Sequence, residues 1–178
     1  MSSLPEVWLR GPLPTIPDLL QPVAHALLQA KEEINEYAKD MDELLLWQKP
    51  LGLASVGFHL QHIAGVQDRL FTYAKGEALS EEQLAYLDNE GKENNTITIK
   101  NLLENLNKQT AISIEALSNT KTIILTEVRN VGRKQVPSTV IGLLVHAAEH
   151  TMRHTGQLLV TIKLLSSPLF KAGEQSRH

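Results

Sequence analysis

The sequence predicts an all-α protein, a four-helix bundle with a long crossover before its last helix. The chain has 178 residues, which is enough for one domain with a real core. Aromatic residues make up only 4% of it, so aliphatic side chains must fill that core, as they do in packed helices. Apolar residues also recur at steps of three and four along several long segments. We therefore expect a single domain over residues 1–178.

The first long helix is predicted over residues 18–41. Its apolar positions are Leu19, Leu20, Val23, Leu27, Ala30, Ile34 and Tyr37. These steps of three and four mark an amphipathic helix, and Pro22 falls in its first turns, where a missing N–H costs little. Four prolines interrupt residues 1–17, so we expect that segment to be an extended arm.

The second long helix is predicted over residues 56–76, with Ser55 as its N-cap and Gly76 as its C-terminal stop. Ser80 is expected to open a short helix, because two acidic residues follow it and suit the helix dipole. A polar loop should come next. A third long helix is predicted over residues 98–119 from its leucine and isoleucine spacing.

The segment between the third and last long helices is rich in residues that favour β-structure. We expect an irregular crossover with a strand-like piece, and at about 18 residues it is long for a helical bundle. The last helix is predicted to begin near Pro137–Thr139 and to end near Ser166. Residues 167–178 are expected to form a loose tail.

Composition excludes several classes of protein. The formal charge is −3 and no run of Lys or Arg stands out, so binding to nucleic acid through its phosphates is not expected. The chain has no cysteine, which excludes disulfides, thiolate nucleophiles and cysteine-ligated metals. The proline-broken N-terminus lacks the apolar run of a signal peptide, and no stretch is long enough to cross a membrane. We expect a cytoplasmic protein.

A column of histidines is the feature of the sequence that indicates a function. His146, His150 and His154 are each four residues apart, so they share one helix face, and His59 and His62 are neighbours on the second long helix. Two histidines at i and i+4 can reach one ion. A third histidine from a facing helix would give three protein ligands and leave one coordination position open. The column spans about 12 Å, so one ion can take only one adjacent pair from it. Spacing does not choose the pair. A cluster of hydrogen-bonded histidines without metal is the alternative.

The segments "GFHLQHIAG" and "HAAEHTMRHTGQL" resemble the DinB-like superfamily of four-helix metalloproteins. The resemblance implies that His62, His150 and His154 hold one divalent ion, nickel or zinc. It also implies a thiol S-transferase, with bacillithiol, mycothiol or glutathione as nucleophile and a small electrophile as acceptor, in detoxification or stress response. Two alternatives stay open: a non-enzymatic metal-binding or dimerising helical stress protein, and a metal-dependent hydrolase. A homodimer is expected from the bundle type.

Further residues are candidates for the outer layer or wall of the site. His146 and His59 lie one turn from the implied ligands, and Gln157 follows His154 by three residues. Each has an ordinary hydrogen-bonding role as its alternative. Arg129 and Arg133 precede the last helix and suit the carboxylates of a small thiol, although a solvated loop charge is the simpler interpretation.

Some nearby residues are expected to be structural. Glu149 should pair with Arg153 one turn along the helix. Asp68 and Arg69 should form a surface or interhelical pair, and His25 should be a buried structural histidine. Gly156 is expected to allow close helix packing at the site.

Overall fold

The computed structural model describes residues 4–168 and 170, and within them it contains five α-helices and one two-stranded antiparallel sheet. The helices are α1 (Gln21–Ala38), α2 (Val56–Ala74), α3 (Glu81–Asn89), α4 (Ile99–Ser118) and α5 (Val140–Ser166). The strands are β1 (Val128–Val131) and β2 (Val136–Thr139). Short 3-10 turns occupy Val7–Arg10, Asp18–Leu20, Glu43–Leu45, Pro50–Gly52 and Thr122–Ile124. The predicted helical fold class is confirmed.

Side-chain caps set the helix boundaries near the expected residues. Ser55 Oγ accepts from the backbone N–H of Phe58 at the start of α2, and Thr139 caps α5 in the same way. Ser80 opens α3 with a reciprocal capping box. Gly76 follows α2 with a φ of 84°, a conformation that suits glycine. Each N-cap side chain accepts a hydrogen bond from a backbone N–H that the start of the helix would otherwise leave unpaired.

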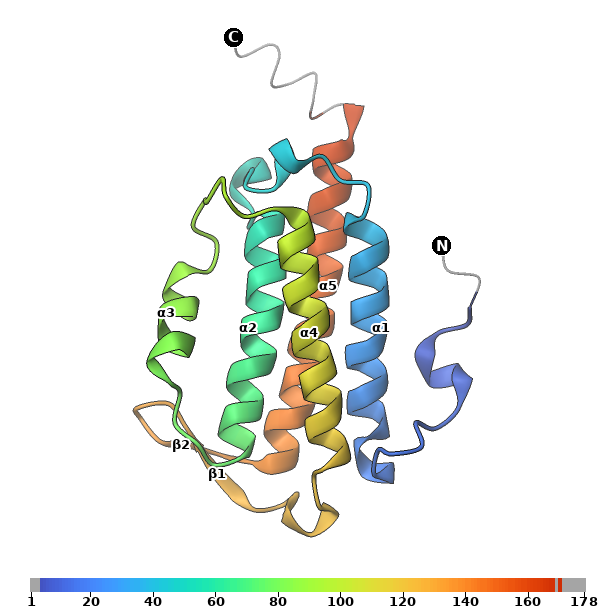
Figure 1. Cartoon of the computed structure of the whole chain (residues 1–178), viewed down its shortest axis with the longest axis vertical. Coiled ribbons are helices and arrows are strands. Elements are labelled where there is room, and N and C mark those ends of the chain that lie inside the picture. Colours follow the sequence, from blue (N-terminus) through green and yellow to red (C-terminus); the bar gives the residue numbers. More distant parts are fainter. Residues whose placement is uncertain (1–3, 169, 171–178) are drawn as a thin grey trace.

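Helices α1, α2, α4 and α5 form the bundle, and each packs against two neighbours. α5 lies between α1 and α2, and α4 contacts both α1 and α2 from the other side. Figure 1 shows α2 and α5 running in opposite directions, with α3 outside the bundle beside α2. The chain must therefore cross the bundle between α1 and α2 and again between α4 and α5. The predicted long crossover before the last helix is the second of these.

The crossover from α4 to α5 carries a β-hairpin, which is more regular than the expected strand-like piece. Val128 pairs with Thr139 and Val131 pairs with Val136. Gly132 directly follows β1 and Gln135 directly precedes β2, and both have positive φ values. The β-rich composition of this segment thus produces two paired strands at one end of the bundle (Figure 1).

The N-terminal arm is bound to α1 along its described part. The backbone N–H of Val7 donates to Gln29, and Arg10 forms an ion pair with Glu32 at 2.7 Å. Val7 is buried in a 3-10 turn, so this stretch is not simply extended as predicted. Residues 1–3 of the arm and residues 169 and 171–178 of the predicted tail lie outside the described residues.

The described core falls into two apolar clusters stacked along the bundle. One cluster includes Leu27, Phe71 and Leu144, and the other includes Ile34, Leu60 and Leu158. A set of buried polar side chains lies on the same helices: Gln67, Thr110, Ser113, Thr151 and Thr155. Within the described part, none of the helices has both the length and the apolar character needed to cross a bilayer.

Candidate metal centre

Three histidines from two antiparallel helices converge where α2 packs against α5. His62 comes from α2, and His150 and His154 come from consecutive turns of α5. Each offers one ring nitrogen, and these three atoms lie within 4.8 Å of one another. His62 Nε2 is 2.9 Å from His150 Nε2, and the rings of His62 and His154 are centred 4.5 Å apart. All three are half-buried, so this group could hold one metal ion that solvent or a ligand can still reach.

The protonation of His62 follows from its contact with Glu90. His62 Nδ1 lies 2.6 Å from Glu90 Oε2, and an ionised carboxylate can only accept hydrogen bonds. His62 Nδ1 must therefore carry a proton and donate it to Glu90. In neutral His62 the lone pair is then on Nε2, the atom that faces His150. Phe58 stacks on the His62 ring with an interplanar angle of 14°, which further limits its rotation.

Glu90 is a buried carboxylate with two partners. Its side chain is only 4% exposed, and its Oε1 accepts from Arg69 Nη1 at 2.6 Å. Burial raises the pKa of Glu90, but the hydrogen bonds and charges of His62 and Arg69 outweigh it, so the net pKa is lowered. Glu90 is consequently ionised at neutral pH. The chain thereby places a negative charge directly behind one of the three histidines.

His59 occupies the equivalent position behind His154. The His59 side chain is buried, and its Nδ1 lies 3.0 Å from His154 Nδ1, so one nitrogen donates and the other accepts. Burial, with the charge of His62 adding to it, lowers the pKa of His59 to about 4. Burial and then the neighbouring histidine charges lower the pKa of His154 to about 4 as well. Both imidazoles are neutral at pH 7, the form that binds metals.

The donor set fits a borderline transition metal. Three imidazole ligands suit zinc, nickel, copper or iron rather than magnesium or calcium, which prefer oxygen. Among the described residues, His150 Nδ1 is buried with no hydrogen-bond partner. Burial, followed by the charges of His62 and other neighbours, lowers the pKa of His150. Three protein ligands leave a position for a further ligand, which is the pattern of catalytic zinc sites.

His146 and Gln157 lie at the margins of this group. His146 stands beside His150 with ring centres 5.3 Å apart, and its exposed side chain has Nδ1 3.4 Å from Glu149 Oε2. His146, Glu149 and His150 form a second, more exposed group that could hold an ion. Glu149 also accepts from Arg153, which is the pair expected from their spacing. Gln157 is exposed on α5.

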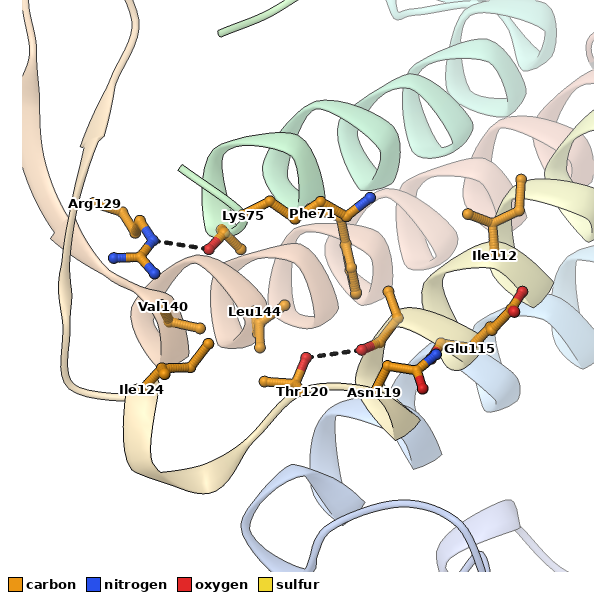
Figure 2. Close-up of a pocket in the computed structure, with 12 residues that line it drawn as sticks. Phe71, Lys75, Ile112, Glu115, Asn119, Thr120, Ile124, Arg129, Val140 and Leu144 are labelled. Carbon is orange, nitrogen blue, oxygen red and sulfur yellow. Dashed lines mark hydrogen bonds between the residues drawn. The ribbon is translucent and has the colours of Figure 1, made fainter. Parts of the chain in front are cut away.

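Arg129 and Arg133 do not approach the histidines. Arg129 Nε donates to the carbonyl of Ala74 at the end of α2, twelve residues beyond His62, which is about 18 Å along the helix. Arg129 borders the cavity of about 440 Å³ shown in Figure 2, between the ends of α2 and α4, the start of α5 and the crossover. Arg133 lines a different cavity on the hairpin. Their predicted place beside the site is not what the fold gives.

Two other expectations were also wrong in detail. Arg69 pairs with Glu90, which lies outside α2. Among the described residues, no ion pair joins Arg69 to Asp68. A side chain at Gly156 would meet no atom within 4 Å, so this glycine does not allow a close helix contact. His25 is half-buried on α1, and its buried Nε2 has no partner among the described residues.

Sequence reasoning missed Glu90, which follows a short helix in a polar segment and looks like any solvated acid. The one local signal is Gly91, whose φ of 76° allows the chain to turn directly after Glu90. The partner His62 lies 28 residues earlier in the chain. No periodic pattern links the two positions, so only the fold brings them together.

A family model for the DinB superfamily matches residues 26–158. Among curated proteins, no sequence matches this chain. The crystal structure of a conserved protein from Enterococcus faecalis is similar, with a TM-score of 0.65 and 20% identity. That similarity covers 82% of this chain and 95% of the other, and at this identity it supports the fold alone.

Proposed function

The chain belongs to the DinB superfamily, and we propose that it is a metal-dependent transferase that adds a low-molecular-weight thiol to a small electrophile. The observation that carries the proposal is the convergence of His62, His150 and His154 within 4.8 Å. Two of these imidazoles have a hydrogen-bonded partner at Nδ1, as the histidine ligands of metal centres generally do.

The three histidines would hold the ion, and the Nδ1 contacts of two of them bear on which nitrogen they offer. His62 offers Nε2 because its Nδ1–H is donated to Glu90. His154 contacts His59 through Nδ1, and when that nitrogen is the donor, the lone pair on Nε2 is available to the ion. A divalent ion bound here would lower the pKa of a thiol and favour its thiolate form. Phe58 shields one face of His62 from water.

The nucleophile must come from outside the chain, because the chain has no cysteine. A small thiol of the bacillithiol, mycothiol or glutathione type would supply it. The histidine group is only half-buried, which leaves an approach for such a molecule from the protein surface. A stress-response role, a homodimer, a cytoplasmic location and the choice of nickel or zinc remain predictions from the sequence.

Metal binding is the first test. We expect protein purified without a histidine tag, then reconstituted with Zn²⁺ or Ni²⁺, to hold close to one ion per chain by elemental analysis. His150→Ala should lower that occupancy sharply. His25→Gln is the matched control, because His25 belongs to α1 and is absent from the histidine group. Wild-type protein that retains no more metal than His150→Ala would contradict the proposal.

A second assay separates an enzyme from a module that its ion merely stabilises. Thiol consumption is followed against a panel of small electrophiles, with and without a chelator. We expect metal-loaded protein to accelerate consumption and the chelator to abolish the acceleration. Stoichiometric metal with no acceleration for any thiol in the panel would favour the non-enzymatic alternative. Release of acid from an ester panel would favour the hydrolase.

A further inference from the structure

We propose that Glu90 is a positioning residue of this site, which holds the lone pair of His62 on Nε2 and directs it toward His150 and His154. The inference rests on the metal site proposed above and deepens it. Glu90 itself would not touch the ion. It would act through His62, by accepting the Nδ1 proton and fixing the orientation of the ring.

Each oxygen of the Glu90 carboxylate has a different hydrogen-bond partner. Oε2 accepts from His62 Nδ1 and Oε1 accepts from Arg69 Nη1, each at 2.6 Å. Hydrogen bonds to an ionised acceptor are short and strong, and two of them fix the plane of the carboxylate. An ion pair that only fastened the chain to α2 would need Arg69 alone. The second oxygen is committed to the histidine.

The face of α2 beneath Glu90 is built for this contact. His62, Gly65 and Arg69 are spaced by three and four residues, so they form one stripe along the helix. A side chain at Gly65 would overlap Glu90 Oε1, Arg69 Nη1 and the ring of Tyr86. Glycine at this position therefore leaves the space that the carboxylate occupies between its two partners.

The segment that carries Glu90 is fastened to α2 on both sides of it. Before Glu90, the Tyr86 hydroxyl donates to the carbonyl of Gln61 at 3.1 Å. After it, the Gly91 N–H donates to Gln61 Oε1 at 2.7 Å, and Gln61 is buried. Both hydrogen bonds are accepted by Gln61, the residue next to His62. The position of Glu90 is thus fixed relative to the histidine and does not depend on the ion pair alone.

The amide variant makes a distinctive prediction for the tautomer of His62. In Glu90→Gln the amide has one oxygen, which the charged Arg69 should attract. Its NH₂ would then face His62 Nδ1 and require that nitrogen to accept. His62 should change from the Nδ1–H to the Nε2–H form and lose the lone pair on the side of the other histidines.

Two double variants separate positioning from structural support. Glu90→Gln with Arg69→Met and Glu90→Met with Arg69→Met both remove the buried charge pair. They differ in one respect: the glutamine oxygen is free to accept from His62 Nδ1–H, whereas methionine offers only a weak sulfur acceptor. Glu32→Gln is a control for loss of a carboxylate, since Glu32 pairs with Arg10 far from the histidines.

The experiment has one readout without metal and one with it. Long-range ¹H–¹⁵N spectra of the metal-free proteins report the tautomer of His62. Competition with a chromophoric chelator reports the affinity for Zn²⁺. We expect Nδ1–H in wild type, in Glu32→Gln and in the glutamine double variant. We expect Nε2–H in Glu90→Gln and no Nδ1–H preference in the methionine double variant.

Zinc affinity should follow the tautomer. We expect a loss of about 10- to 100-fold in Glu90→Gln and in the methionine double variant, with a substantial recovery in the glutamine double variant. Equal affinities and equal tautomers in the two double variants would overturn the inference. If wild-type protein binds no zinc, the proposed function fails, whereas the tautomer of the metal-free protein still decides the role of Glu90.

Discussion

Two connecting segments each bring a charged side chain to α2, and the two contacts differ in what they support. The segment that holds α3 delivers Glu90, whose 4% exposed carboxylate binds the side chains of His62 and Arg69. The hairpin segment delivers Arg129, which donates to the backbone carbonyl of Ala74 and pairs with the exposed Glu127. One contact orients a group that could bind metal, and the other caps a helix end.

Burial and partner type account for the difference. A helix-end carbonyl accepts from any nearby donor, and water can replace Arg129 there. The carboxylate of Glu90 is shut off from water, so each of its oxygens needs a protein partner. A buried charge held by two fixed partners keeps the side chains of those partners in a defined orientation, whereas an accessible charge mainly adds stability. The two contacts can therefore be compared by mutation.

The largest expected effect is on stability after loss of each arginine. Arg69→Met leaves Glu90 buried without its cationic partner, so the free energy of unfolding should fall by about 3–5 kcal/mol. Arg129→Met removes a helix-end hydrogen bond and an accessible ion pair and should cost about 1 kcal/mol. Urea unfolding of the metal-free proteins measures both. Equal losses would mean that the two contacts are energetically alike.

Glycine substitutions on α2 and α5 sharpen the comparison. Gly65→Ala should lower stability by about 1–3 kcal/mol, because the new methyl overlaps Glu90 and Arg69. Zinc affinity should fall with it. The control, Gly156→Ala, has open space around its new methyl and should raise stability by up to about 1 kcal/mol through helix propensity. A stabilised Gly65→Ala variant would show that the contact can move without cost.

The pH dependence of stability should distinguish the histidine contacts from the Arg129 contact. The folded pKa of buried His59 is about 4, below its ordinary value of 6.5. Between those values the unfolded chain binds a proton that the folded chain does not, so stability is full above pH 6.5 and falls toward pH 4. The metal-free wild type should lose stability on acidification more steeply than His59→Leu. Arg129→Met should keep the wild-type slope, and identical slopes in all three would contradict the assignment.

The smallest expected effect is that of His146. Its side chain is 51% exposed and touches Glu149, which already binds Arg153. His146→Ala should change stability by less than about 0.5 kcal/mol and leave zinc occupancy at the His62 group near that of wild type. Elemental analysis beside His150→Ala checks this. A large loss of metal would assign the ion to the His146, Glu149 and His150 group instead.

Local periodicity explains how much of this protein could be read from sequence. Helix spacing placed the long helices to within a few residues, and caps such as Ser55 and Ser80 marked their starts. The same spacing placed His146, His150 and His154 on one face and limited a single ion to an adjacent pair. These features depend only on the rise and rotation of a helix, which the sequence carries residue by residue.

Tertiary structure alone decided which side chains meet across the chain. His62 faces His150 and His59 faces His154 because α2 and α5 are antiparallel at a particular register. Glu90 reaches His62 across 28 residues, while Arg129, which charge alone suggested as a site residue, is held at the far end of α2. Such contacts depend on the paths of the connecting segments and on the space left by Gly65. No repeat of hydrophobicity or charge along the chain encodes them, because each joins residues that belong to different elements.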